Sequence, residues 1–338
     1  MSKRLLPLLG LLAAGCSMIP DYQRPAAPVP ETWPPLQAAA VLGESGRVPA
    51  ARDWRERFPD PRLQALVAAA LEHNRDLRIA LARVDEARAQ AGLARADRLP
   101  QIDALAQRAA SLTPGDLSAT NRQLNSQRYD VNLGVSAFEL DFWGRVKSLD
   151  EAARAAFLAS DYAQQSFRLG LIGDVASAYF SSIELQERVT LAATTLANRG
   201  ESRRLIVARR DVGLAGDLDV LAADSAMQAT RAELANLNRQ LAAAENALRL
   251  LVGATPELPA GRRLAEQELV AQVPVGLPSD VLLARPDVLA AEQRLLAANA
   301  NIGAARAAFL PRILLTAALG TASRSLAGLF DAGSGAWS

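Results

Sequence analysis

Residues that supply chemistry to proteins are scarce in this chain of 338 residues, which has one cysteine, Cys16, and one histidine, His73. A single cysteine excludes an internal disulfide and a metal cluster built on cysteines. His73 lies in the helical pattern ALEHNRD without an apparent metal-binding or catalytic partner, so we interpret it as a solvated helix residue. The sequence also lacks a nucleophile paired with a base, a metal-binding cluster and a phosphate-binding loop. We therefore expect neither an enzyme nor a bound cofactor.

An excess of charge of either sign is missing too. The 37 basic and 36 acidic residues nearly cancel, to a net charge of +1, so no overall field attracts nucleic acid or an acidic substrate. Aromatic residues make up only 5% of the chain, while Ala, Leu, Arg, Gln and Glu are abundant. This composition favours long helices over a compact core, and we expect no nucleic-acid partner.

The N-terminus carries an apolar run that is too short to span a bilayer. The run covers Leu5–Ala14 and follows two basic residues. Small residues come after it, which completes the pattern of a signal peptide. We therefore predict a signal peptide over residues 1–15.

The residues around Cys16 resemble a bacterial lipobox. The resemblance implies that Cys16 becomes the lipidated N-terminus of the mature chain. Because Ser17 follows it, the resemblance also implies the outer membrane. The alternative is a plain cleaved signal that leaves a free thiol. The proline-rich segment that continues from the cysteine, residues 16–58, is predicted to be an extended strap between the lipid and the folded body.

Long helices dominate the rest of the chain. A helix over 61–98 is predicted to begin after Asp60, a residue type favoured at N-caps, with Pro61 in its first turn. Proline is absent from residue 115 to 255, and residues 145–210 are a run of helix-forming residues. At about 1.5 Å per residue, such a helix is roughly 100 Å long, which exceeds the thickness of an ordinary domain.

A turn over 211–217, with the sequence DVGLAGD, is predicted to reverse the chain and to lead into a helix over 217–252. Apolar residues recur alternately three and four positions apart along this helix, which predicts a coiled-coil partner. We interpret Met227 in this seam as a packing residue, not a ligand. The seam consists of Val220, Ala223, Met227, Thr230, Leu234, Leu237, Leu241, Ala244, Leu248 and Leu251.

A β-hairpin is predicted within residues 101–143. The segment RYDVNLGVSAFELDFWGR, residues 128–145, alternates apolar and polar residues, and its phase changes at Phe138, as at a bulge or a change of environment. Strands of about nine to eleven residues with one apolar and one polar face suit a membrane barrel, where Phe142 and Trp143 would lie at the interface. A half-buried hairpin of a soluble sheet is the alternative.

The chain contains an internal duplication. Residues 71–106 align without gaps on residues 282–317, at a constant offset of 211 positions, with 14 of 36 positions identical. The shared residues include Asp, Arg, Gly and the pair Leu-Pro, so an abundance of alanine does not explain the match. We therefore divide the body into a first repeat, 59–252, an equatorial linker, 253–281, and the start of a second repeat, 282–338.

Four segments together resemble the TolC-like outer-membrane efflux family, and within it the OprM-type lipoprotein branch. They are CSMIPDYQRPAAP, DPRLQALVAAALEHNRDLRIAL, ELDFWGRV and GLPSDVLLARPDVLAAEQRLLAANANIGAARAAFLPRI. The resemblance implies a fold that is mainly α with membrane β: a long coiled-coil α-helical barrel plus β-barrel hairpins, built from the tandem repeat and completed by trimerisation. Closure of the barrel is also a physical requirement, because lipid does not tolerate an open sheet edge.

The same resemblance implies a function. The chain would be a lipid-anchored outer-membrane channel that extends into the periplasm, a passive conduit for drugs or other small molecules. An inner-membrane pump would deliver them through a periplasmic adaptor protein, so the partners would be the other copies of a homotrimer, the adaptor, the pump and outer-membrane lipid. The family's adaptor-docking motif matches Val212, Gly213 and Leu214. A left-handed turn position explains Gly213 equally well and is compatible with docking.

A complete second repeat would end at about residue 463. The chain stops at Ser338, so we expect a fragment of a full duct, with three strands per protomer and the family's gate residues outside it. A lipid-anchored periplasmic coiled-coil scaffold without pore activity is the competing hypothesis, since the strap and the heptads alone would permit it.

Overall fold

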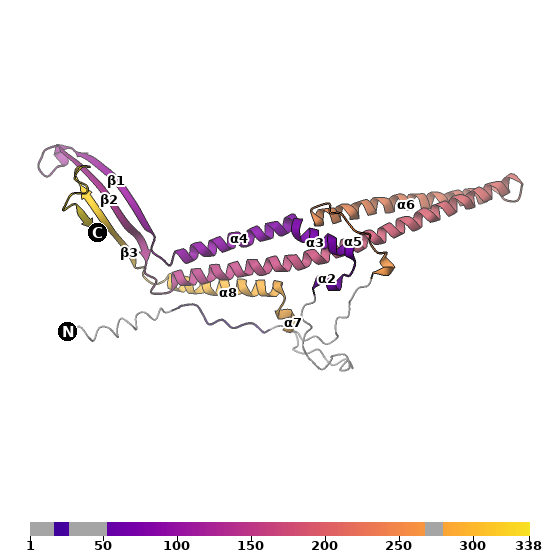
Figure 1. The fold of residues 1–338 in the computed structure, drawn as a ribbon, viewed down its shortest axis with the longest axis horizontal. Coiled ribbons are helices and arrows are strands. Elements are labelled where there is room, and N and C mark those ends of the chain that lie inside the picture. Colours follow the sequence, from indigo (N-terminus) through magenta and orange to yellow (C-terminus); the bar gives the residue numbers. More distant parts are fainter. Residues whose placement is uncertain (1–16, 27–52, 268–279) are drawn as a thin grey trace. The chain divides into compact units, whose positions relative to one another are not determined.

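The computed structural model describes residues 17–26, 53–267 and 280–338 (Figure 1). The predicted signal peptide, Cys16, most of the strap and part of the equatorial linker lie outside the described residues. The described chain forms two compact units. Unit 1 contains residues 17–26, 84–160 and 290–338, and unit 2 contains residues 53–83, 161–267 and 280–289. Each unit includes parts of both predicted repeats, so the units do not coincide with the repeats.

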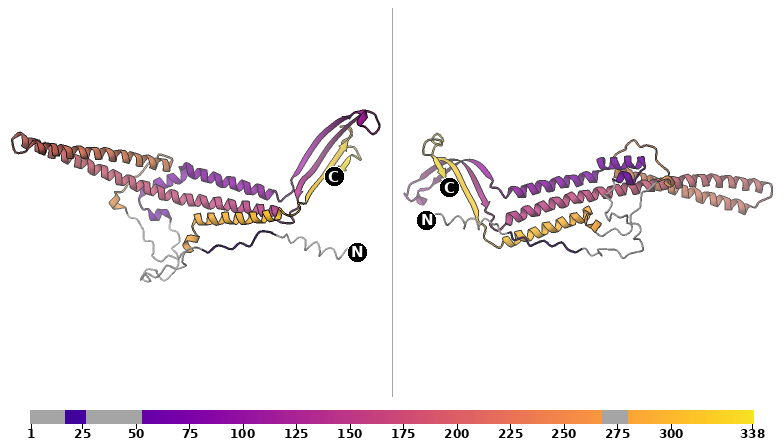
Figure 2. Two further views of the ribbon diagram at one scale, coloured as in Figure 1. Left: turned by 180° about the vertical axis from the view of Figure 1, so that it is seen from behind. Right: turned by 60° about the horizontal axis from the view of Figure 1, so that its bottom comes forward.

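The two copies of the repeat have the same local structure at the offset seen in the sequence. α4 spans Arg75–Ala96 and α8 spans Pro286–Ala307, which are 22 residues each. Each helix is followed by a strand, β1 at Ile102–Thr113 and β3 at Leu314–Ser323. In unit 1, α4 and α8 lie on either side of the start of α5, which spans Arg145–Asp211 (Figure 2).

Unit 1 also contains one antiparallel sheet, with the strand order β1-β2-β3-β4. β2 spans Leu124–Glu139 and pairs with β1 along the whole of that strand, so a β1–β2 hairpin is present. The expectation of three strands is wrong, because a fourth strand, β4 at Gly335–Trp337, pairs with β3. A strand of three residues is too short to show the alternation by which a sequence reveals strands.

Unit 2 has its hydrophobic core where α3 (Pro61–His73), α5 and α6 (Asp217–Val252) meet. α6 has the bounds expected from the sequence, and α5 is one residue longer than expected. The shorter elements are α2 (Trp54–Arg57), a 3₁₀ turn at Leu264–Glu266 and α7 (Asp280–Leu283). The buried core residues are Leu63, Leu66, Val67, Ala70, Leu77, Leu171, Ile172, Val175, Ala176, Tyr179 and Val252.

The single helix predicted over 61–98 is wrong, because Asn74 divides it into α3 and α4. The ψ angle of Asn74 is 128°, which is outside the helical range, and its side-chain Oδ1 accepts a hydrogen bond of 2.8 Å from the amide of Leu77. Its Nδ2 donates to the carbonyl oxygen of Leu251 at 2.8 Å, near the end of α6. Gly253, which caps α6 with φ +71°, lies so close to the carbonyl of His73 that no larger residue fits.

The heptad seam of α6 faces α5, as predicted for a coiled-coil pair. All ten seam residues are at least partly shielded, and Leu237 is 3% exposed, whereas Leu218 and Leu221 outside the seam are largely exposed. Ion pairs connect the helices, with 2.7 Å between Arg203 Nε and Asp224 Oδ1. Met227 is half-buried in this seam, in agreement with a packing role.

Candidate functional site

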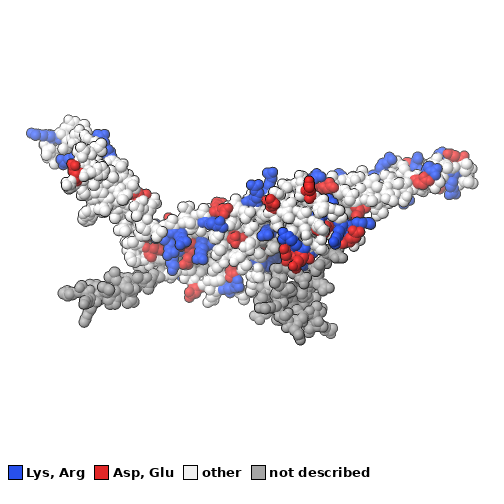
Figure 3. Space-filling model, in the orientation of Figure 1, with Lys and Arg blue, Asp and Glu red and all other residues white. Residues whose placement is uncertain are grey.

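The sheet of unit 1 separates apolar from polar side chains. The strand register aligns ten side chains on one surface, which we call the apolar face. One of them, Thr321, is polar, and the other nine are Ile102, Ala104, Ala106, Val131, Leu133, Val135, Ala317, Leu319 and Trp337. Nothing in the described chain covers the larger of these side chains, since Leu133 is 59%, Leu319 71% and Trp337 84% exposed. Figure 3 shows the sheet as mostly uncharged, with charged side chains gathered near the β1–β2 loop.

The opposite surface, which we call the polar face, carries charged, amide and small side chains. They are Asp103, Gln107, Arg128, Asp130, Asn132, Gly134, Ala318, Gly320 and Ala322. The apolar side chains of Leu105 and Ala109 lie on the same face. Asp130 is buried and pairs with Arg128 at 2.7 Å. Gly320 approaches Asn132 so closely that a Cβ would overlap the carbonyl oxygen of Val131, which explains why glycine occupies this position.

A β-bulge keeps the apolar face continuous where the sequence changes phase. The register shifts between Val135 and Phe138, and Ala137 has φ +56°. Because one extra residue is inserted, Phe138 lies opposite Leu315 and on the same face as Val135. Of the two explanations for the phase change, the bulge is therefore the correct one.

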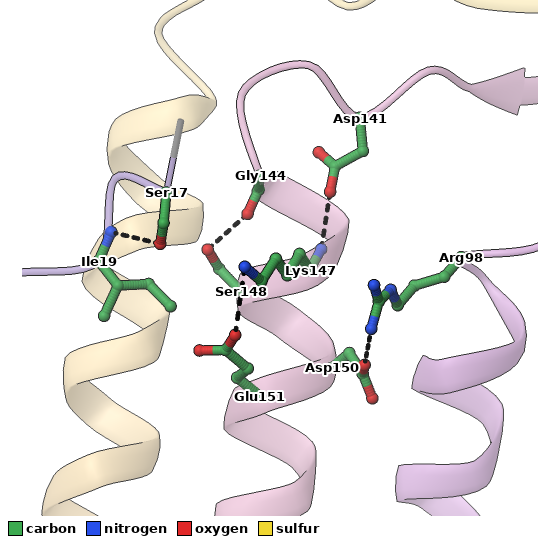
Figure 4. Close-up of polar contacts among 9 residues, drawn as sticks. All are labelled: Ser17, Ile19, Arg98, Asp141, Gly144, Lys147, Ser148, Asp150 and Glu151. Atoms are coloured by element: carbon green, nitrogen blue, oxygen red, sulfur yellow. Dashed lines mark hydrogen bonds and ion pairs between the residues drawn. The ribbon is translucent and has the colours of Figure 1, made fainter. Parts of the chain in front are cut away.

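Below the bulge, polar contacts join the sheet to α5. β2 ends at Glu139, earlier than the predicted hairpin, because the chain turns there and the side chain of Asp141 accepts a hydrogen bond of 2.8 Å from the amide of Lys147 (Figure 4). Glu139 holds Arg145 through two hydrogen bonds, of 2.6 and 2.8 Å. Trp143 is half-buried, and its ring nitrogen donates to the carbonyl of Pro311 at 3.0 Å.

Residues 17–26, which we call the strap segment, lie against α8. The guanidinium of Arg24 binds both carboxylate oxygens of Glu292, with 2.7 Å from Nε to Oε1. Asn299 donates a hydrogen bond of 2.8 Å to the carbonyl of Pro20. Ile19 lies beside Gly303, where a Cβ would come within 2.5 Å of the Ile19 side chain. Hydrogen bonding from Arg24 lowers the pKa of Glu292 below its usual value.

The predicted docking motif lies in the turn between α5 and α6. Gly213 has φ +76°, and the amides of Gly213 and Leu214 donate to the carbonyls of Arg210 and Arg209, both at 2.8 Å. This is a Schellman cap, which requires a left-handed residue, so the conformational explanation of Gly213 holds. Val212 and Leu214 are each 69% exposed, and nothing lies within 4 Å of a Cβ built on Gly213. The turn therefore presents a small, open apolar surface.

Asp60 has a wider role than the N-cap predicted from the sequence. Its buried carboxylate accepts hydrogen bonds from the amide of Arg62 at 2.9 Å, from the hydroxyl of Tyr179 at 2.7 Å and from the side chain of Gln267 at 2.7 Å. Burial opposes ionisation, but these hydrogen bonds hold the pKa of Asp60 below its usual value. Burial and the bond to Asp60 raise the pKa of Tyr179. Of these three contacts, only the capping bond from the amide of Arg62 could be predicted from the sequence, because Tyr179 and Gln267 are 119 and 207 positions from Asp60.

His73 ends α3 with its side chain half-exposed, 3.9 Å from the carboxylate of Glu72. In the part of the chain that the structure describes, no group of three or more His, Cys, Asp or Glu residues is placed to hold a metal ion. Among the described helices, none has an apolar stretch long enough to cross a bilayer. The sites of interest are therefore the two faces of the sheet, the strap segment and the turn.

Known proteins share this architecture. The family model described as outer membrane efflux protein matches residues 66–254 and 277–338. The chain is 44% identical over 337 residues to the solvent efflux pump outer membrane protein SrpC of Pseudomonas putida, an alignment that covers 98% of this chain and 71% of SrpC.

Two solved structures are similar over most of the chain. A membrane protein from Pseudomonas aeruginosa gives a TM-score of 0.84 at 42% identity, over 96% of this chain and 72% of that protein. The open state of the MtrE outer membrane channel of Neisseria gonorrhoeae gives a TM-score of 0.81 at 37% identity, over 96% of this chain and 71% of MtrE.

The long paired helices and the amphipathic sheet, together with these similarities, define the TolC-like channel fold, an α-helical barrel plus a β-barrel. The chain belongs to the outer membrane efflux protein family. It is an outer-membrane channel subunit of a tripartite efflux system, so the resemblance found in the sequence is confirmed.

Proposed function

We propose that this channel subunit is a passive conduit, without catalytic or cofactor chemistry, that works as a homotrimer. β1 is an edge strand of the described sheet. Because an unpaired edge is not tolerated in lipid, strands of other copies are needed to close a barrel around the pore. The similarity to a solvent efflux pump component supports small organic molecules, such as drugs and solvents, as cargo.

The observation that carries this proposal is the contrast between the two faces of the sheet. A lipid-facing surface must be apolar, whereas a surface that lines an aqueous pore can be polar. Ala104 and Gln107 lie on the same strand and on opposite faces. Ala104→Arg would place a charge against lipid, at a cost of about 2–4 kcal/mol near the midplane. Gln107→Arg is the matched control, because the same charge would face the pore.

We expect Ala104→Arg to reduce the amount of heat-modifiable trimer in outer membranes and the number of conducting pores in planar bilayers. Gln107→Arg should keep both, with at most a change in ion selectivity. Equal tolerance of the two substitutions would contradict a membrane sheet. Trimers that insert but never conduct would instead favour the lipid-anchored scaffold, the competing hypothesis.

We propose that the exposed residues Val212, Gly213 and Leu214 dock the periplasmic adaptor, through which the inner-membrane pump delivers cargo. The open space around Gly213 supports this, since a partner could approach the backbone there. Gly213→Arg should leave trimers intact and abolish drug resistance in a complementation assay. Gly213→Ala, which adds comparable backbone strain but little bulk, should retain much of the resistance. Full resistance with Gly213→Arg would end the docking role.

We also propose that Cys16 is lipidated and tethers the strap to the outer membrane, with the helices in the periplasm. The ordered contacts of the strap segment with α8 support a chain that leaves the body at a fixed place. Intact mass measurement of protein extracted from outer membranes would show three acyl chains on Cys16. A mass without acyl chains would instead support the plain cleaved signal.

A further inference from the structure

One end of the apolar face carries a charged residue that the channel function does not use. Two cross-strand rows of that face, which begin at Ile102 and Ala104, are entirely apolar. The third row, which begins at Ala106, contains Thr321 beside the apolar Val131. In the next row, Arg108 lies opposite Tyr129, which lies opposite Ser323. We call Arg108, Tyr129 and Ser323 the rim row.

The position of the rim row corresponds to the far edge of a membrane. From Leu315, opposite Phe138 at the bulge, to Ser323 the strand advances roughly 27 Å at about 3.4 Å per residue. Membrane barrels have an apolar band about 25 Å tall, and at their strand tilt of about 40° an advance of roughly 27 Å is a rise of roughly 21 Å, which ends close to the far edge of the band. A guanidinium costs about 2–4 kcal/mol at the midplane but only about 0–1 kcal/mol near the interface. Arg108 therefore fits the interface and not the hydrocarbon.

The charge of Arg108 is not neutralised within the described residues. Its guanidinium lies 5.7 Å from the centre of the Tyr129 ring and 3.4 Å from the Gln127 side-chain oxygen, and no carboxylate is at ion-pair distance. Arg128, next to Tyr129 but on the polar face, shows the contrast, because Asp130 pairs with it at 2.7 Å. Arg108 on the apolar face thus has guanidinium donors without an acidic partner, whereas Arg128 on the polar face has one.

We propose that the rim row binds the phosphate groups of outer-leaflet lipids. A guanidinium presents two parallel donors that match a phosphate, and such charge-assisted bonds are stronger than neutral ones. Tyr129 suits the same depth, because its ring is apolar and its hydroxyl is polar. The inference rests on the proposed membrane position of the apolar face, and it adds a lipid-binding site to it.

The test compares lipid retention by Arg108→Gln and by Arg154→Gln, purified as trimers. Arg154 is an exposed residue of α5, so its substitution removes the same charge from a helix. Each protein is placed in nanodiscs that contain diphosphoryl lipid A or its dephosphorylated form, and the bound lipid is counted by native mass spectrometry. We expect wild type and Arg154→Gln to retain about ten times more of the phosphorylated lipid. In Arg108→Gln, the ratio of phosphorylated to dephosphorylated lipid should fall at least fivefold.

Three results would overturn the proposal. One is an unchanged preference in Arg108→Gln, and another is no preference in wild type. The third is full competition by millimolar inorganic phosphate, which would indicate a free-anion site. If Arg108→Gln does not form trimers, Arg108→Lys tests the same point, because it keeps the charge and should lose only the two-pronged contact. Pore conductance is recorded in parallel to separate the two proposals. If Arg108→Gln keeps normal conductance and loses the lipid preference, the effect belongs to the rim row alone. If wild type forms no pores, the result contradicts the proposed function.

Discussion

The two copies of the repeat, α4 with β1 and α8 with β3, share their secondary structure and differ in what surrounds them. Gly92 of α4 has nothing within 4 Å of a Cβ position, whereas a Cβ on the corresponding Gly303 would come within 2.5 Å of Ile19 and 2.9 Å of Ser148. Glu292 of α8 binds Arg24, whereas the corresponding residue of α4 is Leu81, which is 47% exposed. Residues that the copies share determine the local backbone, and residues that differ determine which segment packs against it.

The starts of the two helices differ in the same way. Asn74 precedes α4, is buried and forms hydrogen bonds at both ends of its side chain. Arg285 occupies the corresponding place before α8, and it forms an exposed ion pair of 2.7 Å with Asp287. A helix start can therefore be fixed by a buried amide in one copy and by surface charges in the other.

The largest difference between the copies is expected for leucine at the two glycines. Gly303→Leu would force Ile19 and Ser148 apart, and overpacking of this kind costs about 1–3 kcal/mol. Gly92→Leu should instead stabilise α4 by up to about 1 kcal/mol, because glycine is a poor helix residue. The midpoint of urea unfolding, followed by circular dichroism of the purified protein, measures both. Equal effects at the two positions would show that their surroundings do not differ.

A smaller difference is expected for alanine at the helix starts. Asn74→Ala removes the cap of α4 and leaves the carbonyl of Leu251 without its donor, so we expect a loss of about 1–2 kcal/mol. Arg285→Ala removes only an exposed ion pair, and the urea midpoint should stay unchanged. Asn74→Asp separates the two contacts of Asn74, since aspartate can cap α4 but cannot donate to Leu251. An Asn74→Asp protein as stable as wild type would assign the whole effect to the cap.

Local patterns in the sequence were enough to predict features that depend on neighbouring residues. The bounds of α5 follow from a run of helix-forming residues without proline, and the seam of α6 follows from periodicity. The phase change at Phe138 indicated either a bulge or a change of environment, and the register decides for the bulge. Features that depend on distant residues were not predictable. The break at Asn74 needs Leu251, which is 177 positions away, and the strap segment needs Glu292, which is 268 positions from Arg24.

The candidate sites divide along the same line. The exposure of the docking turn was predictable because a tight turn between two helices projects its own residues. The rim row was not, because Arg108, Tyr129 and Ser323 come from three strands and only the register brings them together. Alternation within one strand shows that a residue lies on a face, but not which residues lie beside it.

The smallest expected effect concerns the strap segment, which distinguishes α8 from α4. Glu292→Gln removes the charge that binds Arg24, so we expect the amides of residues 17–26 to exchange hydrogen about fivefold faster. Leu81→Glu, which places a carboxylate at the corresponding position of α4, should leave that exchange unchanged.

The same ion pair should make the exchange depend on pH. Because Arg24 lowers the pKa of Glu292, the stabilisation of the strap segment by Glu292 is present above the usual carboxyl pKa of about 4.3 and is lost as the pH falls below it. Wild type should therefore approach the Glu292→Gln rate, corrected for intrinsic exchange, only in acid. A strap segment that exchanges equally slowly in both proteins would mean that Ile19 and Asn299 hold it without the ion pair.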